Sequence, residues 1–243
     1  MTLIRDFFRR RRLARHLAEH GWTFDFHGTS VSLPPDTNLA VANALIKGKY
    51  EAEEARLIGA HLPTGRPVLE LGGSLGVVSG FIRSRLDPGT PHLIVEANPH
   101  LVDLCASNAG GAEVLCKAVS YDGPVVRFEI AENPHASMLS TGAEAGIETV
   151  EVDTTTLAEL WQRMGAPEGF SLVADIEGAE VAMVEKDADT LAHAGTILME
   201  LHPHLHPDGD AVVDRMRARL EQLGFTLVEN SAAVFLWSRA VTE

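Results

Sequence analysis

The fold is decided by Val68-Leu69-Glu70-Leu71-Gly72-Gly73-Ser74-Leu75-Gly76, an apolar run that passes through a carboxylate into small residues. This pattern is typical of a buried β-strand followed by a tight turn. A helix is expected from Val77, and its N-terminal amide groups and dipole would point at whatever faces the turn. Small residues let the backbone approach a ligand closely, so we predict a ligand-binding turn; a tight turn without a ligand is the alternative.

The turn does not fit a dinucleotide. The G-x-G-x-x-G fingerprint would need glycine at the positions of Ser74 and Val77. The carboxylate of Glu70 would repel a pyrophosphate, whereas it would attract a sulfonium or an ammonium group. An NAD-dependent oxidoreductase is therefore disfavoured.

Strands alternate with helices on the C-terminal side of this stretch, which predicts a parallel sheet with helices on both faces. The last two strands, 225–229 and 233–238, are joined by only three residues, too few for a crossover, so they must be antiparallel. The prediction is an α/β fold with a doubly wound, seven-stranded, mostly parallel sheet whose last strand is antiparallel. The other strands are expected at 67–71, 92–96, 113–119, 170–175 and 196–200, with helices at 77–86, 100–108, 178–193 and 208–223.

Residues 1–44 are predicted to form an extension, and residues 45–243 the main domain. The extension begins with an arginine-rich segment of helical pattern and continues with alternating residues around Gly28, which predict a hairpin. Two further helices are expected at 39–46 and 51–62.

An insertion is expected at 120–169, between the third and fourth strands of the sheet. Residues 125–130 and 149–152 are strand-like, and residues 132–142 have the composition of a flexible loop. Long insertions at the strand ends of such sheets often form lids or substrate walls.

Charge is distributed unevenly along the 243 residues, whose net charge is −14. Residues 1–15 hold six arginines and a single acid, Asp6, so the remainder carries −19. A body this acidic repels phosphate backbones, which argues against nucleic acid as a partner. The basic segment could lie on an anionic membrane, but a terminal helix with a solvated basic face, packed on the acidic body, is favoured.

The cysteine count and hydropathy indicate a soluble, cytoplasmic protein. Two cysteines are too few for a disulfide framework, which favours a reducing compartment. No stretch of about 18 apolar residues occurs, so no integral membrane association is expected.

Polar residues follow several strands at the edge where doubly wound sheets bind ligands. Glu96 ends the second strand, where a carboxylate can accept both hydroxyls of a ribose. Asp175 and Glu200 end two strands in the middle of the sheet, and His202 and Glu177 lie close by in the sequence. We expect these four side chains to converge on one rim. For Glu180 we prefer a structural role, as an acid favoured at a helix start.

Four motifs together resemble the FkbM-type methyltransferases. They are Glu70-x-Gly72-x-Ser74-x-Gly76, Glu96-Ala97-Asn98-Pro99, Asp175-Ile176-Glu177-Gly178-Ala179-Glu180 and Glu200-Leu201-His202-Pro203. The third is the most specific, and the resemblance covers about residues 45–238. The first loop departs from the family's usual Asp-x-Gly-Ala-Asn-x-Gly, because Glu70, Gly73 and Ser74 replace its Asp, Ala and Asn.

The resemblance implies a class I, S-adenosylmethionine-dependent enzyme that methylates a hydroxyl oxygen of a sugar or another secondary metabolite. The Asn/Asp-Pro-Pro-Tyr tetrapeptide of N-methyltransferases is absent, since Asp175-Ile176-Glu177-Gly178 occupies its place. A small-molecule acceptor is the expected partner, and a homodimer is possible. The alternative function is a non-catalytic cofactor-binding or regulatory module. The cofactor residues are expected to be Tyr50, Glu51, Glu70, Gly72, Gly73, Ser74, Gly76, Glu96, Ala97, Asn98 and Asp175.

The catalytic candidates are Asp175, Glu200, His202 and His135, because a hydroxyl nucleophile needs its proton removed or its oxyanion stabilised. A neutral His202 with an ordinary pKa near 6.5 would suit that role at pH 7. A divalent cation on Asp175 and Glu200, similar to that of catechol-type enzymes, is a minority alternative. A cluster of His202, His204 and His206 around a metal is disfavoured, because histidines flanked by proline in a loop are usually solvated.

Overall fold

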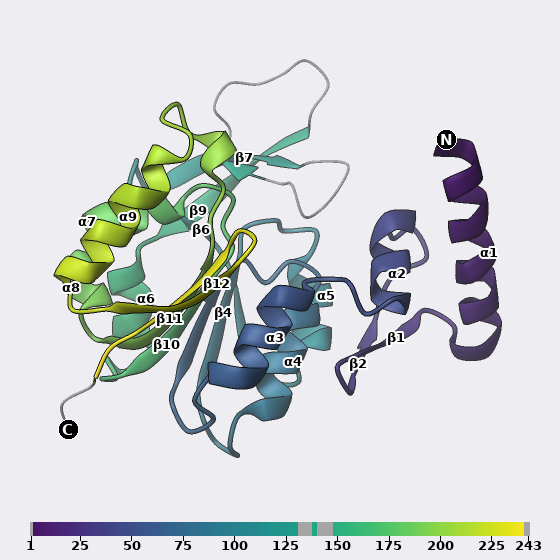
Figure 1. Ribbon diagram of the computed structural model, residues 1–243, viewed down its shortest axis with the longest axis horizontal. Coiled ribbons are helices and arrows are strands. Elements are labelled where there is room, and N and C mark those ends of the chain that lie inside the picture. The colour runs from purple at the N-terminus through teal and green to yellow at the C-terminus, as the bar shows by residue number, and fades with distance from the viewer. Residues whose placement is uncertain (1, 131–137, 140–147, 241–243) are drawn as a thin grey trace.

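The computed structural model describes residues 2–130, 138–139 and 148–240 (Figure 1). A seven-stranded sheet forms the centre, in the order β12-β13-β11-β10-β3-β4-β5. β13 is antiparallel to both of its neighbours, and every other pair is parallel, so the predicted fold class is confirmed. The strands are β3 (Val68–Leu71), β4 (His92–Glu96), β5 (Glu113–Cys116), β10 (Phe170–Ala174), β11 (Ala194–Glu200), β12 (Thr226–Ser231) and β13 (Val234–Ser238).

Helices cover both faces of this sheet (Figure 1). All side chains of β3, β4 and β10 are buried, as expected of parallel strands covered on both sides. Apolar residues of α3 and α4 pack in one core and those of α6, α7 and α9 in the other. The helices are α3 (Ala52–His61), α4 (Val77–Arg85), α5 (Val102–Asn108), α6 (Leu157–Arg163), α7 (Glu180–Lys186), α8 (Ala188–Leu191) and α9 (Ala211–Gln222), with a short 3₁₀ turn, η2 (Pro203–Leu205).

Two predicted elements are divided. The helix expected at 178–193 is two helices, α7 and α8, which meet at Asp187. The Asp187 carboxylate accepts the backbone N–H of Leu157 at 2.9 Å and so caps the first turn of α6. The chain therefore leaves the helical conformation at Asp187, and the Asp187 carboxylate bonds the start of α6.

The strand expected at 113–119 is also divided, because the chain changes sheets at Lys117. β5 stays in the main sheet, and β6 (Ala118–Val119) joins a four-stranded sheet in the order β6-β9-β7-β8. The rest of that sheet comes from the predicted insertion. Of the loop expected at 132–142, only residues 138–139 are described, and His135 lies outside the described residues. The strands are β7 (Val125–Ile130), β8 (Met138–Leu139) and β9 (Glu148–Thr155).

The N-terminal residues form a lobe at one end of the molecule's longest axis (Figure 1). The predicted hairpin is present, and so are the arginine-rich helix and the helix expected at 39–46. Asn108 joins the lobe to the body, since its amide bonds the backbone of Ser32 and donates to the carbonyl of Leu75 at 2.9 Å. None of the described helices is long and apolar enough to cross a membrane. The lobe contains α1 (Thr2–His20), β1 (Thr23–Phe26), β2 (Thr29–Ser32) and α2 (Leu39–Ile46).

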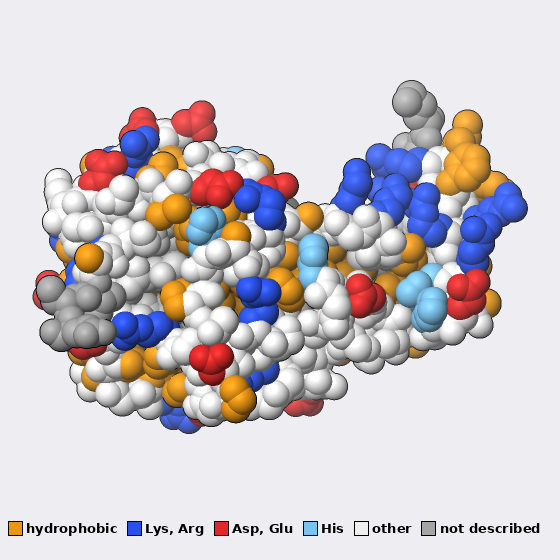
Figure 2. All heavy atoms as spheres, turned by 60° about the horizontal axis from the view of Figure 1, so that its bottom comes forward, with side chains coloured by type: hydrophobic (Ala, Val, Ile, Leu, Met, Phe, Trp, Pro, Cys, Tyr) orange, Lys and Arg blue, Asp and Glu red, His pale blue; other side chains and the backbone are white. Residues whose placement is uncertain are grey.

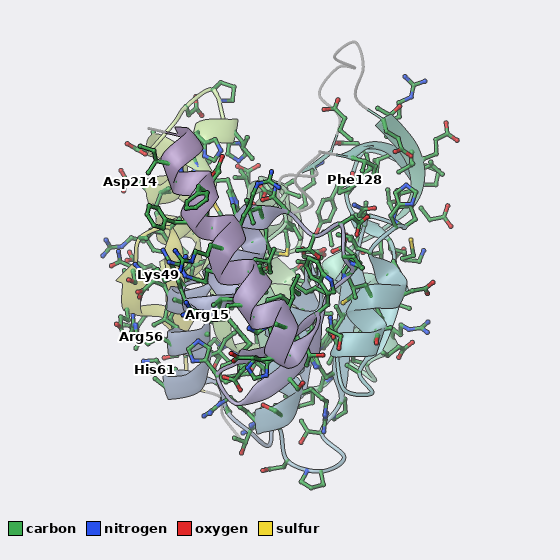
Figure 3. All side chains as sticks on the ribbon, turned by 90° about the vertical axis from the view of Figure 1, so that its right-hand side faces the viewer. Arg15, Lys49, Arg56, His61, Phe128 and Asp214 are labelled. Atoms are coloured by element: carbon green, nitrogen blue, oxygen red, sulfur yellow. The ribbon has the colours of Figure 1, made fainter. Side chains whose placement is uncertain are left out.

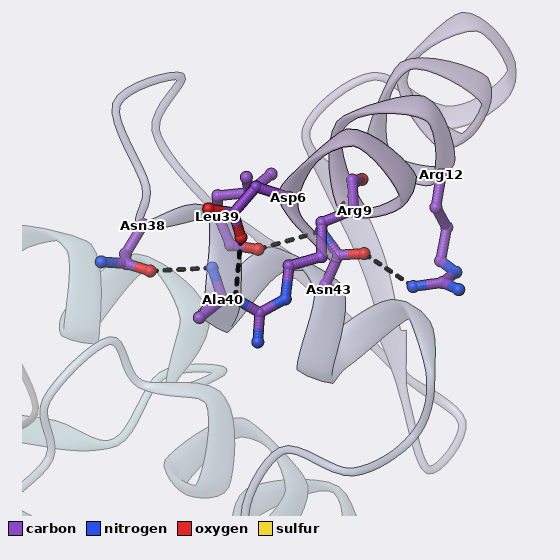
Figure 4. A network of polar contacts seen from close by, with 7 residues as sticks. All are labelled: Asp6, Arg9, Arg12, Asn38, Leu39, Ala40 and Asn43. Carbon is purple, nitrogen blue, oxygen red and sulfur yellow. Dashed lines mark hydrogen bonds and ion pairs between the residues drawn. The ribbon is translucent and has the colours of Figure 1, made fainter. Parts of the chain in front are cut away.

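Polar contacts fix α1 on α2 (Figure 4). Arg12 donates to the side-chain oxygen of Asn43 at 2.9 Å, and the Asn43 amide donates to the carbonyl of Arg9 at 3.1 Å. Leu13 packs against the core beneath, and the ring of His16 stacks on Phe24 at 4.5 Å. One face of α1 therefore packs against the rest of the lobe.

Deleting residues 1–15 should leave the affinity for S-adenosylhomocysteine unchanged within about twofold, an energy change of about 0.4 kcal/mol. The reason is that these residues contact the lobe and line no cavity near the ends of β3 and β10. Isothermal titration of the truncated and full-length chains measures the difference. A folded truncation that no longer binds would show that α1 supports the pocket.

Candidate active site

A cleft opens where β3, β4 and β10 end, and it is walled on the far side by the small sheet. About 620 Å³ of empty space lies in it, including its open mouth. Ser74, Glu96, Ala97 and Asp175, all predicted to contact a cofactor, line it, and so does Phe128 of β7, which is labelled in Figure 3. The cleft lies at the sheet edge where doubly wound folds bind ligands.

A second cavity adjoins the first across the turn that follows β3, with about 380 Å³ of empty space including the part open to solvent. Tyr50, Glu51 and Glu70 line it together with Gly73. Gly72, Ser74 and Asp175 line both cavities, so one elongated ligand could extend from one to the other. Gly76 and Asn98 line neither.

The glycines of the turn are required by the protein's own backbone. Gly72 has φ +90°, and a Cβ there would overlap the carbonyl oxygen of Asp175. A Cβ on Gly73 would lie 2.6 Å from the Cys105 sulfur, and one on Gly76 2.6 Å from the Cys105 carbonyl oxygen. The small size of these residues is therefore needed for contacts within the protein, with Asp175 and with α5, while Gly72 and Gly73 also line the cavities.

Glu96 ties the turn to the end of β4. One carboxylate oxygen accepts the backbone N–H of Ser74 at 2.6 Å, and the other accepts that of Asn98 at 2.6 Å. Burial raises the pKa of Glu96, and the backbone hydrogen bonds oppose the rise. Each oxygen can accept a second hydrogen bond, so the side chain is able to receive two hydroxyls from the cleft that it lines.

Glu70 is already paired within the protein. Ser79 donates to one carboxylate oxygen at 2.6 Å, and His92 bonds the other at 2.8 Å. All three side chains are buried. Glu70 therefore anchors α4 and β4 to β3, and it also lines the second cavity.

Four carboxylates surround His202 at the rim of the site. Nε2 of His202 lies 3.6 Å from Asp175, 3.6 Å from Glu177 and 4.0 Å from Glu200, while Nδ1 lies 3.8 Å from Glu180. Asp175 follows β10 and Glu200 ends β11, which are neighbours in the sheet. The structure thus brings together the rim that the sequence predicts.

The charge state of His202 differs from the expected one. Burial disfavours the imidazolium, but the negative charges of Glu180, Asp175 and Glu177 outweigh it and raise the pKa of His202 to about 9. The prediction of an ordinary pKa near 6.5 is therefore wrong for the ligand-free protein, in which His202 is protonated at pH 7. Burial, followed by the charge of Glu200, raises the pKa of Asp175.

Glu180 has the structural role that we preferred, through hydrogen bonds. It is buried at the first position of α7 and accepts the backbone N–H groups of Ile176 and Gly178, both at 2.8 Å. Between them, Glu177 is held at φ +50°, a conformation that costs energy and therefore needs such support. Glu180 is thus a positioning residue for Asp175 and Glu177.

The start of α3 adds acids to the second cavity. Glu51 has φ +37°, and burial, with the charges of Glu200 and Glu177, raises its pKa to about 7. Burial also raises the pKa values of Tyr50 and Glu54. Sequence reasoning missed Glu54, although its spacing of three from Glu51 places both on one face of a helix.

Asp175, Glu200 and His202 could hold a divalent cation, because each offers a ligand atom within 4.8 Å of the others. His202 would have to lose its proton first, since only a neutral imidazole binds a metal. His204 and His206 are not part of this group; His204 is exposed, its ring 5.9 Å from that of His202.

Comparison with solved structures finds similar folds. The chain resembles fibrillarin from Aeropyrum pernix, solved with S-adenosyl-L-methionine, at 14% identity and a TM-score of 0.47 over 77% of this chain and 74% of that one. It resembles the O-methyltransferase TomG from Streptomyces achromogenes, also solved with S-adenosylmethionine, at 15% identity and a TM-score of 0.48 over 79% and 81%. No curated protein matches the chain.

The comparison with family models is more specific. Residues 58–227, which are well over half of the chain, match the methyltransferase FkbM domain. The match spans the turn after β3, Glu96 and the rim around His202. The chain therefore belongs to the FkbM family of S-adenosylmethionine-dependent methyltransferases.

Proposed function

We propose that the protein transfers the methyl group of S-adenosylmethionine to a hydroxyl oxygen of a small molecule. The observation that carries the proposal is the pair of adjoining cavities, which share Gly72, Ser74 and Asp175 and lie beside the rim around His202. The nucleoside would lie in the first cavity, where Glu96 can accept ribose hydroxyls. The acids of the second cavity, Glu51 and Glu70 among them, suit the ammonium group of the methionine end.

The bound cofactor supplies an electrophilic methyl group on a sulfonium, and the protein's contribution is chiefly to place the two reactants in line. His202 is the proposed proton acceptor. Nε2 of His202 would take the hydroxyl proton as the acceptor oxygen receives the methyl group that the bound cofactor would supply. Glu180 lies 3.8 Å from Nδ1, where it can orient the ring, and Asp175 and Glu200, near Nε2, stabilise the charge that the imidazole gains.

The high pKa of His202 is compatible with this role because the cofactor is itself a cation. A positive charge nearby disfavours the imidazolium and lowers the pKa of His202 toward neutrality. The ligand-free protein would therefore keep the base protonated, and cofactor binding would release it. Asp175, whose pKa burial raises, is the alternative proton acceptor.

A non-catalytic module that keeps the cofactor pocket is the second candidate. Titration with S-adenosylhomocysteine alone does not separate the two, because both would bind it. Conversion of S-adenosylmethionine to S-adenosylhomocysteine in the presence of hydroxylated acceptors does, since only an enzyme consumes the methyl donor. Binding without consumption by any acceptor would support the module.

Treatment with EDTA should leave the turnover number unchanged within about twofold. The three side chains that could hold a cation already neutralise part of their charge through the proton on His202. The measurement compares initial rates after dialysis against EDTA with rates after Mg²⁺ is restored. Loss of turnover that Mg²⁺ recovers would instead assign the activation of the hydroxyl to a bound cation.

A further inference from the structure

An apolar group on the outer face of α1 is left without a packing partner. Ile4, Phe7 and Phe8 are 67%, 61% and 55% exposed. The only other large hydrophobic residues comparably exposed in the described part of the chain are Val125 and Val228, which are single residues at 44% and 46%. A cluster of three, two of them aromatic, on one helical turn is therefore a candidate contact surface.

Arginines continue this surface along the helix. Ile4, Phe8, Arg11 and Arg15 are spaced at i, i+4, i+7 and i+11, which places them on one face. Arg5 and Arg10 are exposed beside them. Figure 2 shows Lys and Arg side chains gathered along the lobe, with hydrophobic side chains beside them, and Figure 3 shows α1 crossing the end of the molecule. The outer face of α1 therefore carries an apolar cluster near its N-terminus and arginines further along the helix.

The opposite face of α1 cannot take this role, because the lobe occupies it. Arg9 and Arg12 are half-buried and belong to the network around Asn43, and Leu13 packs inward. These contacts hold the helix so that Phe7, Phe8 and Arg11 point away from the body. The surface is therefore presented by a folded helix and need not be ordered by its partner.

The place of α1 in the molecule separates its charge from the acidic body. Residues 1–15 carry +5 and the remainder −19, and α1 lies at the end of the longest axis opposite α7 and α9 (Figure 1). Charges separated by more than about 8–10 Å are largely screened at physiological ionic strength. An anionic surface approached by this end would meet the arginines before it is repelled by the body.

We propose that the outer face of α1 docks the protein on a membrane surface that contains anionic phospholipid. Phenylalanine and isoleucine enter the boundary between headgroups and acyl chains, while arginines alongside pair with phosphate groups. The membrane offers an apolar layer to the isoleucine and the phenylalanines, and phosphate groups to the arginines. The sequence alone favoured a solvated helix; the exposure of Ile4, Phe7 and Phe8 is the structural observation that changes this preference.

A second copy of the chain is a poorer occupant. Parallel face-to-face contact of two α1 helices would bring Arg11 and Arg15 against their own counterparts. The described surface outside α1 offers no cluster of exposed large hydrophobic residues to receive Phe7 and Phe8. Nucleic acid would satisfy the arginines, but it would leave Ile4, Phe7 and Phe8 exposed to solvent.

The test is co-sedimentation of the full chain with vesicles of phosphatidylcholine, with and without phosphatidylglycerol. We expect binding only where phosphatidylglycerol is present, and weaker binding as NaCl is added. Two double variants, Phe7→Ser with Phe8→Ser and Arg11→Glu with Arg15→Glu, should each bind at least about tenfold more weakly. The matched control, Arg215→Glu with Arg217→Glu, makes the same charge change at exposed arginines of α9 and should bind like the unmodified chain.

Each outcome decides the proposal. Far-ultraviolet circular dichroism equal to that of the unmodified chain shows that α1 stays helical in the variants. Failure of the unmodified chain to bind the anionic vesicles, equal binding to pure phosphatidylcholine, or an equal loss in the α9 control would overturn the membrane assignment. If vesicles do not bind but sedimentation velocity shows a dimer that the phenylalanine variant dissociates, the surface belongs to a second copy; retardation of duplex DNA alone would assign it to nucleic acid.

Discussion

Replacing His202 by alanine should reduce the turnover number by about 10²–10⁴-fold, the usual contribution of a positioned proton acceptor. The affinity for the cofactor should not fall. The substitution removes a positive charge from among four carboxylates, which leaves the rim more negative toward a cationic ligand. Steady-state kinetics with a working acceptor and calorimetry with S-adenosylmethionine separate the two effects.

The control for this substitution is His204→Ala. His204 is exposed and lies two residues further along the same loop, so its removal tests the loss of a histidine without disturbing the rim. Full turnover in the His202→Ala protein, together with a large loss in the His204→Ala protein, would show that the base is misassigned.

The pH dependence adds an independent criterion. A base must be deprotonated to act, so activity should rise as the pH passes its pKa. The kcat/KM for S-adenosylmethionine, which reports the cofactor-free protein, should rise toward an apparent pKa near 9, a value that belongs to His202 together with Asp175. The kcat, which reports the loaded complex, should rise at lower pH because the bound cation lowers the pKa. A rise near pH 7 for kcat/KM would favour Glu51 instead.

Replacing Glu96 by alanine should weaken S-adenosylhomocysteine binding by at least about tenfold. Hydrogen bonds to a charged group contribute about 1.5–3 kcal/mol each, and about 1.4 kcal/mol corresponds to a factor of ten. The substitution also releases the N–H groups of Ser74 and Asn98, so the turn would lose its preformed shape. Calorimetry on the folded variant gives the change directly.

Glu113→Ala is the matched control for Glu96, because it removes an exposed acid from the neighbouring strand β5. It should leave the affinity unchanged. A decrease of less than about threefold in the Glu96→Ala protein, about 0.7 kcal/mol, would mean that Glu96 shapes the turn without holding the ligand.

The sheet was predictable because its signals are local. Strands such as β3 and β10 are short apolar runs, and burial on both faces is what such runs indicate in a parallel sheet. The antiparallel pair followed from the length of one connection. The ends of β10 and β11, and therefore the meeting of Asp175 with Glu200, followed from the topology.

The differences between the predicted and the observed structure arise from contacts between residues that lie far apart in the sequence. Nothing near Asp187 in the sequence shows that its carboxylate caps α6, and nothing near Lys117 shows that the chain changes sheets there. The pKa of His202 depends on Glu177 and Glu180, whose approach is set by the strained loop between β10 and α7. Charge states of clustered groups need the three-dimensional arrangement.

The central claim is that this chain moves a methyl group from S-adenosylmethionine to a hydroxyl oxygen. The most direct measurement supplies S-adenosylmethionine labelled with ¹³C in its methyl group to the protein and a panel of sugars and phenols, and follows the label by NMR. The account predicts a new methyl resonance at the chemical shift of a methyl ether, equal in amount to the S-adenosylhomocysteine formed and appearing about 10²–10⁴-fold more slowly with the His202→Ala protein. A resonance at the shift of an N-methyl or C-methyl group, or a label that never leaves the bound cofactor, would contradict it.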